Sequence, residues 1–228
     1  LRKEIAGFRT NIRREQSCSI KSLTRDYLYK QLLSSGEYTF DHMLVIKDPY
    51  GEAPLTALAL FILEEPACVR VTTKGNLKET DFVTELPKKK EHRVPILGMY
   101  AEKANDIVIE ILDDEGNCVK SHTFTIRTKR LPKSLRNVIT VKKWTDKPAY
   151  SNIMINGGVK IHTCVFDIEG EIRYYLSRKP RGYGIFPLSD GHFFYMEKYI
   201  SVPSYSNPQT VESYDMDYFG RVFRTYLR

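Results

Sequence analysis

The sequence predicts a mainly β protein with one short helix near its N-terminus. Three observations support this prediction. Short apolar runs separated by turn residues fill the middle of the chain, an Asp-x-x-Gly-x-(Ile/Val) pattern occurs twice near its end, and a helical spacing of apolar residues is found in the first 36 positions. With 228 residues, 42% of them hydrophobic, the chain is long and apolar enough for one large or two small domains.

The N-terminal segment, residues 1–36, has the signals of a helix in its second half. Apolar side chains recur near the helical period at Ile20, Leu23, Tyr27 and Leu32–Leu33. Ser35 and Gly36 then supply a stop signal. We interpret this segment as a packing helix that lies against a neighbouring sheet or against a second subunit.

Residues 37–130 have the pattern of an antiparallel β-sandwich. Seven short apolar runs are separated by Gly, Asn and Pro turns: Met43–Ile46, Leu55–Leu63, Cys68–Thr72, Phe82–Val83, Val94–Leu97, Ile107–Leu112 and Val119–Ile126. Short strands at this spacing, with no helical segment between them, indicate a sandwich of immunoglobulin-like type. Within it we expect Lys88–Lys90 to form a solvated loop and Asp113–Asn117 to form a hairpin turn.

A basic stretch follows the sandwich. Residues 127–147 contain eight Lys or Arg side chains and one acidic residue, Asp146, in a chain of net charge +7. Trp144 is the single aromatic residue of this stretch, whereas nucleic-acid-binding surfaces combine basic residues with aromatic ones. We therefore interpret residues 131–149 as a basic linker and predict no nucleic-acid partner. The longest apolar run is too short to span a bilayer, so no membrane partner is predicted either.

The C-terminal region, residues 150–228, contains a repeated motif. The Asp-x-x-Gly-x-(Ile/Val) pattern occurs at Asp167–Ile172 and again 50 residues later at Asp217–Val222. Each copy predicts a tight turn between two antiparallel strands, and two further strands lie between the copies. Four strands in each period of this length are typical of a β-propeller blade.

A single blade buries little apolar surface, because neighbouring blades complete its faces. Residues 150–228 therefore predict an incomplete β-propeller, with the first blade and part of the closing blade, cut from a longer protein. Unpaired strand edges tend to pair with another chain. We accordingly expect this chain to form homo-oligomers through its strands at 172–176 or 222–227.

The spacing of cysteines and histidines predicts no metal site and no cofactor. The four cysteines form no Cys-x-x-Cys pair, and no two of the five histidines lie within four residues of each other. We interpret the cysteines as buried thiols, with a Cys68–Cys118 disulfide as the alternative. His162 and His192 are interpreted as structural residues on strands of the C-terminal region.

Three sequence motifs resemble a known family. They are Asp48-Pro-Tyr-Gly-x-x-Pro-Leu-Thr-Ala-Leu58, Val94-Pro-Ile-Leu-Gly-Met-Tyr100 and Leu131-Pro132. This combination resembles the N-terminal sandwich of bacterial arylsulfate sulfotransferases, and the Asp-x-x-Gly repeats, with Leu188–Phe193 between them, resemble the start of that family's propeller. The resemblance covers residues 41–228. Asp48 stands where the family more often has Asn, which affects the turn and not the chemistry.

The resemblance implies a six-bladed propeller behind a small sandwich domain. It also implies an enzyme that transfers a sulfuryl group from an aryl sulfate donor to a phenolic acceptor, without a nucleotide sulfate donor. The family's nucleophile is a funnel histidine that becomes transiently sulfated, which suits the nucleophilicity of neutral imidazole near neutral pH. An exported or periplasmic bacterial location is implied as well, although no signal peptide is visible in this chain.

The family's catalytic strand entry, of Gly-His-His-Asp type, has no counterpart here. The matching entry, Arg181–Phe186, contains no histidine. No catalytic residue is therefore predicted in this chain, and the chain alone is expected to be inactive. Arg181 and Tyr183 are the substrate-binding candidates, because such entries face the central channel. The alternative hypothesis is a non-enzymatic sandwich and propeller module that binds glycans or proteins.

Overall fold

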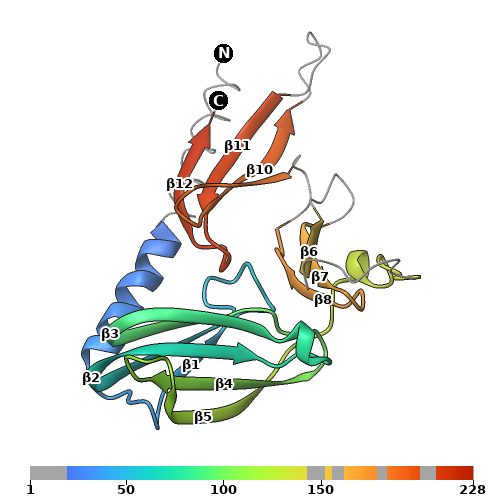
Figure 1. Ribbon diagram of the computed structural model, residues 1–228. Coiled ribbons are helices and arrows are strands. Elements are labelled where there is room, and N and C mark those ends of the chain that lie inside the picture. The colour runs from blue at the N-terminus through green and yellow to red at the C-terminus, as the bar shows by residue number, and fades with distance from the viewer. Residues whose placement is uncertain (1–19, 143–151, 156–161, 179–183, 201–208, 228) are drawn as a thin grey trace.

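The computed structural model describes residues 20–142, 152–155, 162–178, 184–200 and 209–227 (Figure 1). Within them, helical structure is limited to residues 20–34 and two short 3-10 helices, Lys78–Thr80 and Lys133–Leu135. The other regular elements of these residues are β-strands, which confirms the mainly β fold with one N-terminal helix. No helix in the described part of the chain has the length and apolar character needed to cross a membrane.

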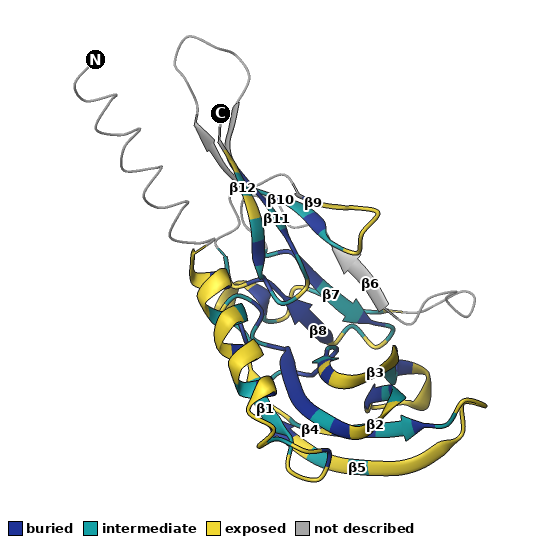
Figure 2. Ribbon diagram, turned by 90° about the vertical axis from the view of Figure 1, so that its left-hand side faces the viewer, coloured by how far each residue is buried: buried dark blue, intermediate teal, exposed yellow. Residues whose placement is uncertain are grey.

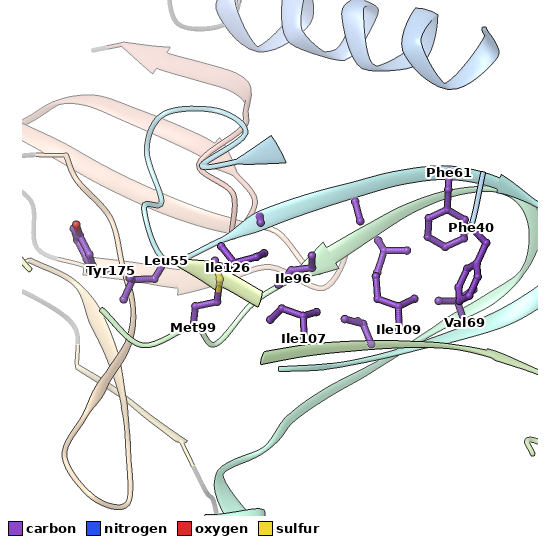
Figure 3. Packing of buried hydrophobic residues seen from close by; sticks show 14 of the residues in the cluster. Phe40, Leu55, Phe61, Val69, Ile96, Met99, Ile107, Ile109, Ile126 and Tyr175 are labelled. Carbon is purple, nitrogen blue, oxygen red and sulfur yellow. The ribbon is translucent and has the colours of Figure 1, made fainter. Parts of the chain in front are cut away.

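Five antiparallel strands form the sheet of the predicted sandwich region: β1 (Leu44–Lys47), β2 (Ala57–Thr73), β3 (Phe82–Ile96), β4 (Ala104–Leu112) and β5 (Cys118–Arg127). β2 pairs with β1 near its start and with β4 near its end, while β3 pairs with both halves of β2. β5 continues the sheet beyond β4. The sheet bends along the β2–β3 ladder, so that its two halves face each other across an apolar core (Figures 1 and 3).

Two pairs of expected strands are joined into single longer ones. The run 55–63, from Ala57 on, and the run 68–72 belong to the 17-residue strand β2, whose pairing with β3 shifts register between Ile62 and Val69. The run 82–83 likewise lies at the start of β3, and the run 94–97 ends one residue beyond the end of β3. The sandwich region therefore has five strands and not seven, because turn signals within the long hairpin mark irregular pairing instead of strand ends.

The Lys88–Lys90 run is not a loop. It lies within β3, where the backbone of Lys89 pairs with Ala67 of β2 and the three lysine side chains point into solvent. Lys88 forms an ion pair with Asp114 at 2.5 Å. Pairing of the backbone with a neighbouring strand overrides the weak strand propensity of lysine.

The first seven residues of β2 are largely buried on both faces, whereas Glu64–Pro66 are exposed. Successive side chains of a strand point to opposite sides, so this part of β2 contacts two different layers. Its odd-numbered residues from 57 to 63, with Val69 and Val71, enter the sandwich core (Figure 3). That core also includes Val94, Ile96, Ile107, Ile109 and Ile126. The even-numbered Leu58 and Leu60 pack on the other side against Tyr29 and Leu33 of the N-terminal helix. The expectation that this helix packs against a sheet is confirmed, but the packing face differs from the predicted one, because Ile20, Leu23 and Tyr27 are exposed.

Two further antiparallel sheets follow the sandwich. The first contains β6 (Asn152–Ile155), β7 (Cys164–Asp167) and β8 (Ile172–Tyr175); the second is a meander of β9 (Gly184–Pro187), β10 (Phe193–Ile200), β11 (Gln209–Met216) and β12 (Val222–Leu227). The four strands that the sequence groups into one period are thus divided between two sheets. A second apolar cluster connects these sheets: Tyr174, Leu176, Ile185, Phe193, Tyr195, Tyr214, Met216 and Val222, with Ala53 from the sandwich region.

The cysteines of the sandwich are free, and the alternative of a Cys68–Cys118 disulfide is wrong. Both residues pair with Leu112 of β4, Cys68 from one side and Cys118 from the other. They are therefore separated by two strand spacings, about 10 Å, which exceeds the reach of a disulfide. Cys164 is a buried thiol, as expected, and burial raises its pKa to about 11. Cys118 is exposed, which corrects the expectation of burial.

Candidate functional site

The predicted substrate-binding residues, Arg181 and Tyr183, lie outside the described residues. Within the described part of the chain, the junction between the sandwich and the two C-terminal sheets contains a completely buried pair of charges. The side chain of Arg173, on β8, is 1% exposed, and that of Asp167, at the end of β7, is 0% exposed. Charged groups are seldom buried unless they are paired and hydrogen-bonded. This junction is therefore the candidate functional site.

Arg173 extends from the C-terminal part of the chain into the sandwich. Its Nε donates to the carbonyl oxygen of Gly98 at 2.6 Å, and its Nη1 donates to that of Thr80 at 2.7 Å. Nη1 also donates to the Tyr100 hydroxyl oxygen at 3.0 Å and lies 3.4 Å from Oδ2 of Asp167. The guanidinium lies 4.0 Å from the centre of the Tyr100 ring. One side chain thus connects β8 to two separate segments of the sandwich.

The motif at residues 94–100 shapes the sandwich side of this contact. Gly98 has a φ of +75°, and a Cβ atom there would lie 2.8 Å from Cβ of Phe82, so only glycine fits without strain. The turn presents the Gly98 carbonyl to Arg173. It also places the Tyr100 hydroxyl so that it donates to Oδ2 of Asp167 at 2.8 Å. Burial raises the pKa of Tyr100, which keeps the hydroxyl protonated as a donor.

The Asp-x-x-Gly motifs are hairpin turns of one geometry. In each turn, Oδ1 of the aspartate accepts the backbone N–H groups two and four residues later; the aspartates are Asp113, Asp167 and Asp217. The turn at Asp113 confirms the hairpin turn expected within the sandwich. Because the turn occurs in both parts of the chain, its local geometry does not identify a blade. Only Asp167 also accepts from a buried cation, since Phe223 occupies the position in the second repeat that Arg173 occupies in the first.

The motif that begins at Asp48 forms a second contact with the C-terminal sheets. The backbone N–H of Ser177 donates to the carbonyl oxygen of Glu52 at 2.8 Å, and Ala53 is fully buried in the apolar cluster of the two sheets. Gly220, in the turn before β12, lies so close that a Cβ atom there would be 2.3 Å from Cβ of Glu52. Both sandwich motifs at 48–58 and 94–100 therefore contribute to the surface that holds the C-terminal sheets.

The N-terminal helix makes a third contact. Oγ of Ser22 accepts the backbone N–H of Val222 at 3.0 Å, and Oδ2 of Asp26 lies 2.7 Å from Nη2 of Arg221. The helix lies at the surface with its exposed side turned outward, as Figure 2 shows. It spans from the sandwich to the start of β12, so all three parts of the chain meet at this junction.

The histidines of the C-terminal region lie just before β7 and β10, and not on the strands as expected. Nδ1 of His162 is 2.9 Å from the carbonyl oxygen of Leu176. Nδ1 of His192 is 3.0 Å from Oδ1 of Asp215, and its ring stacks on Phe223 at 3.9 Å. Among the described residues, no group of three His, Cys, Asp or Glu side chains is arranged to hold a metal ion.

Sequence reasoning missed the role of Arg173, Tyr100 and Asp167. The available signal was a basic residue within the apolar strand Ile172–Leu176, where a solvent-exposed position would be the ordinary interpretation. The junction also borders a cavity of about 360 Å³ whose lining includes Phe82, Arg173 and Tyr218. Nη2 of Arg173 has no hydrogen-bond partner in the described part of the structure.

The five-stranded region is similar to a known class of domain. Residues 44–129 match the family model of the arylsulfotransferase Ig-like domain. No curated protein matches the chain. The match supports an arylsulfotransferase-family N-terminal region, in agreement with the resemblance noted for the motifs at 48–58 and 94–100. The immunoglobulin-like character predicted for this region is confirmed.

Proposed function

We propose that this chain is the N-terminal part of an arylsulfotransferase and that its sandwich is the foundation on which the enzyme's C-terminal sheets are fixed. The observation that carries the proposal is the match of residues 44–129 to the arylsulfotransferase Ig-like domain. The motifs at 48–58 and 94–100 lie in that matched region, and both contribute to the junction with β7–β12. In this proposal the sandwich supports the C-terminal sheets structurally, and the catalytic residues lie elsewhere in the protein.

The two C-terminal sheets are, in this proposal, the beginning of a β-propeller. The meander of β9–β12 corresponds to the first blade and β6–β8 to part of the closing blade. One side of the meander packs in the apolar cluster with β8, whereas the other side carries Phe194, opposite Phe186 in register. Phe186 is 48% exposed and Tyr226 is 44% exposed. This side also carries Asp215 and Arg224 in the row of Phe194, so it is a mixed face with exposed aromatic side chains, which favour contact with a further sheet.

The proposed reaction has two displacement steps at sulfur. A nitrogen of a neutral histidine, outside this chain, attacks the sulfur of an aryl sulfate, and the bond between sulfur and the aryl oxygen breaks to release a phenolate. The oxygen of an acceptor phenol then attacks the same sulfur, the bond between nitrogen and sulfur breaks, and the phenol proton is transferred to a base. Cationic groups would stabilise the sulfuryl oxygens in both steps.

The test uses the full-length protein that the gene encodes and, in parallel, the 228-residue chain. Each is incubated with 4-nitrophenyl sulfate, with and without an acceptor phenol, and release of 4-nitrophenolate and formation of the new aryl sulfate are measured. We expect phenol-dependent transfer by the full-length protein and none by the chain alone. Transfer by the chain alone would contradict the absence of catalytic residues. Absence of transfer by the full-length protein would contradict the enzyme assignment and favour a binding module.

A further inference from the structure

Asp26 of the N-terminal helix is held by three donors from three other elements. Tyr50, in the loop between β1 and β2, donates its hydroxyl to Oδ1 of Asp26. Nη2 of Arg93, on β3, lies 3.5 Å from the same oxygen. Nη2 of Arg221, in the turn before β12, lies 2.7 Å from Oδ2. The aspartate side chain is 17% exposed, so this carboxylate is largely enclosed by its donors.

The three donors are held in place by contacts that do not involve Asp26. The Tyr50 ring packs edge-on against Tyr29 at 5.8 Å, and its hydroxyl oxygen accepts from Arg93 at 3.3 Å. The Arg221 guanidinium lies 4.2 Å from the centre of the Phe223 ring. Burial raises the pKa of Tyr50 most, and the hydrogen bond to Asp26 raises it further, so the hydroxyl remains a donor at neutral pH.

The charges of this arrangement favour a bound anion. Two guanidinium groups directed at one point repel each other unless a negative charge lies between them. Two arginines and a hydroxyl donor are a combination that recognises carboxylates and other oxyanions. Asp217 also lines the cavity that Arg93 and Arg221 line, and burial raises the pKa of its carboxyl.

We propose that Tyr50, Arg93 and Arg221 form an oxyanion-binding site that the Asp26 carboxylate fills from within the chain. A small free oxyanion, a carboxylate or sulfate, occupies the site when the Asp26 carboxylate is removed. The N-terminal helix is then a tethered ligand whose bound carboxylate links the sandwich to β12. This inference is independent of the sulfuryl-transfer proposal, because it rests only on contacts among Asp26, Tyr50, Arg93 and Arg221.

The test measures the thermal midpoint of the 228-residue chain and its Asp26→Ala variant in sodium chloride, sodium formate and sodium sulfate at matched ionic strength. Asp26→Ala is expected to have the lower midpoint in chloride. Formate at about five times its Kd is expected to raise the midpoint of the variant by about 2–4 °C, with a saturable dependence on concentration. Sulfate is likewise expected to raise the midpoint of Asp26→Ala with a saturable dependence, and no such rise would contradict the proposed binding of sulfate.

Asp41→Ala is the matched control. Asp41 is an exposed aspartate whose one ion pair among the described residues is with Lys120 at 2.7 Å, so its removal leaves one exposed lysine and not two converging guanidinium groups. Its midpoint is expected to change with the salts no more than that of the unmodified chain. A second variant, Asp26→Ala with Arg221→Leu, is expected to lose the saturable response to formate. An equal response to formate in all variants, or none in Asp26→Ala, would overturn the proposal.

If Asp26→Ala is too unstable for a thermal transition, Asp26→Asn replaces it. The asparagine keeps the size of the side chain and one acceptor but removes the charge. Its unfolding midpoint in urea is then compared in formate and chloride, with the same expected direction. A midpoint in formate equal to that in chloride would again contradict the site.

Discussion

Asp167→Ala is expected to lower the free energy of unfolding by about 3–5 kcal/mol, the usual consequence of removing one partner of a buried ion pair. The substitution leaves the Arg173 guanidinium buried without its counter-charge and the Tyr100 hydroxyl without its acceptor. It also removes the acceptor for two backbone N–H groups of the turn. The measurement is equilibrium unfolding in urea, followed by circular dichroism.

Asp113→Ala is the control for that prediction. Asp113 accepts the same turn hydrogen bonds as Asp167, but it lies on the exposed β4–β5 hairpin and contacts no buried cation. Its loss is expected to cost about 1 kcal/mol, as for solvent-exposed hydrogen bonds. The difference between the two variants therefore isolates the buried junction. Equal losses of unfolding free energy in the two variants would show that Asp167 stabilises only its own turn and not the buried junction.

Gly220→Ala is the second large effect, with an expected loss of about 2–4 kcal/mol from backbone strain and overpacking together. Gly220 has a φ of +76°, in the left-handed region that side chains disfavour. A Cβ atom at this position would lie 2.3 Å from Cβ of Glu52, so the β11–β12 turn would have to move away from the sandwich loop. The loss is measured by urea unfolding of the purified variant.

Gly191→Ala separates the two causes. Gly191 has a similar φ of +83°, but a Cβ atom there meets nothing within 4 Å. This variant is expected to lose only the strain contribution, about 1–2 kcal/mol. A loss as large as that of Gly220→Ala would mean that close packing on the sandwich contributes nothing at Gly220.

Much of the fold can be predicted from the sequence, because the signals are local. The helical spacing of Ile20, Leu23 and Tyr27 predicts the helix but not its buried face, because all three side chains are exposed. The Asp-x-x-Gly motifs predict turns that the structure contains. The joining of two predicted strands into β2 could not be predicted, because Glu64–Pro66 has the local chemistry of a turn. Only pairing with β3 on both sides of that segment carries the strand through it.

The junction depends on long-range contacts and is not visible in local patterns. Arg173 lies in a strand whose other side chains are apolar. No local pattern in the sequence predicts that the sandwich covers both Arg173 and Asp167. Gly98 and Tyr100 lie in a motif that resembles a family, and the motif alone predicts no contact for either residue. Gly98 accepts a hydrogen bond from Arg173, 75 residues later in the sequence, and Tyr100 donates one to Asp167, 67 residues later.

The most direct test of the junction is a double-mutant cycle between the sandwich and the C-terminal sheets. Tyr100→Phe, Asp167→Asn and the double variant are compared by urea unfolding. Because the Tyr100 hydroxyl donates directly to Asp167, we predict a coupling free energy of at least about 1 kcal/mol, whereas Tyr100→Phe with Asp113→Asn should be additive within about 0.5 kcal/mol. Additive losses for Tyr100 and Asp167 would contradict a sandwich and C-terminal sheets held together by this buried network.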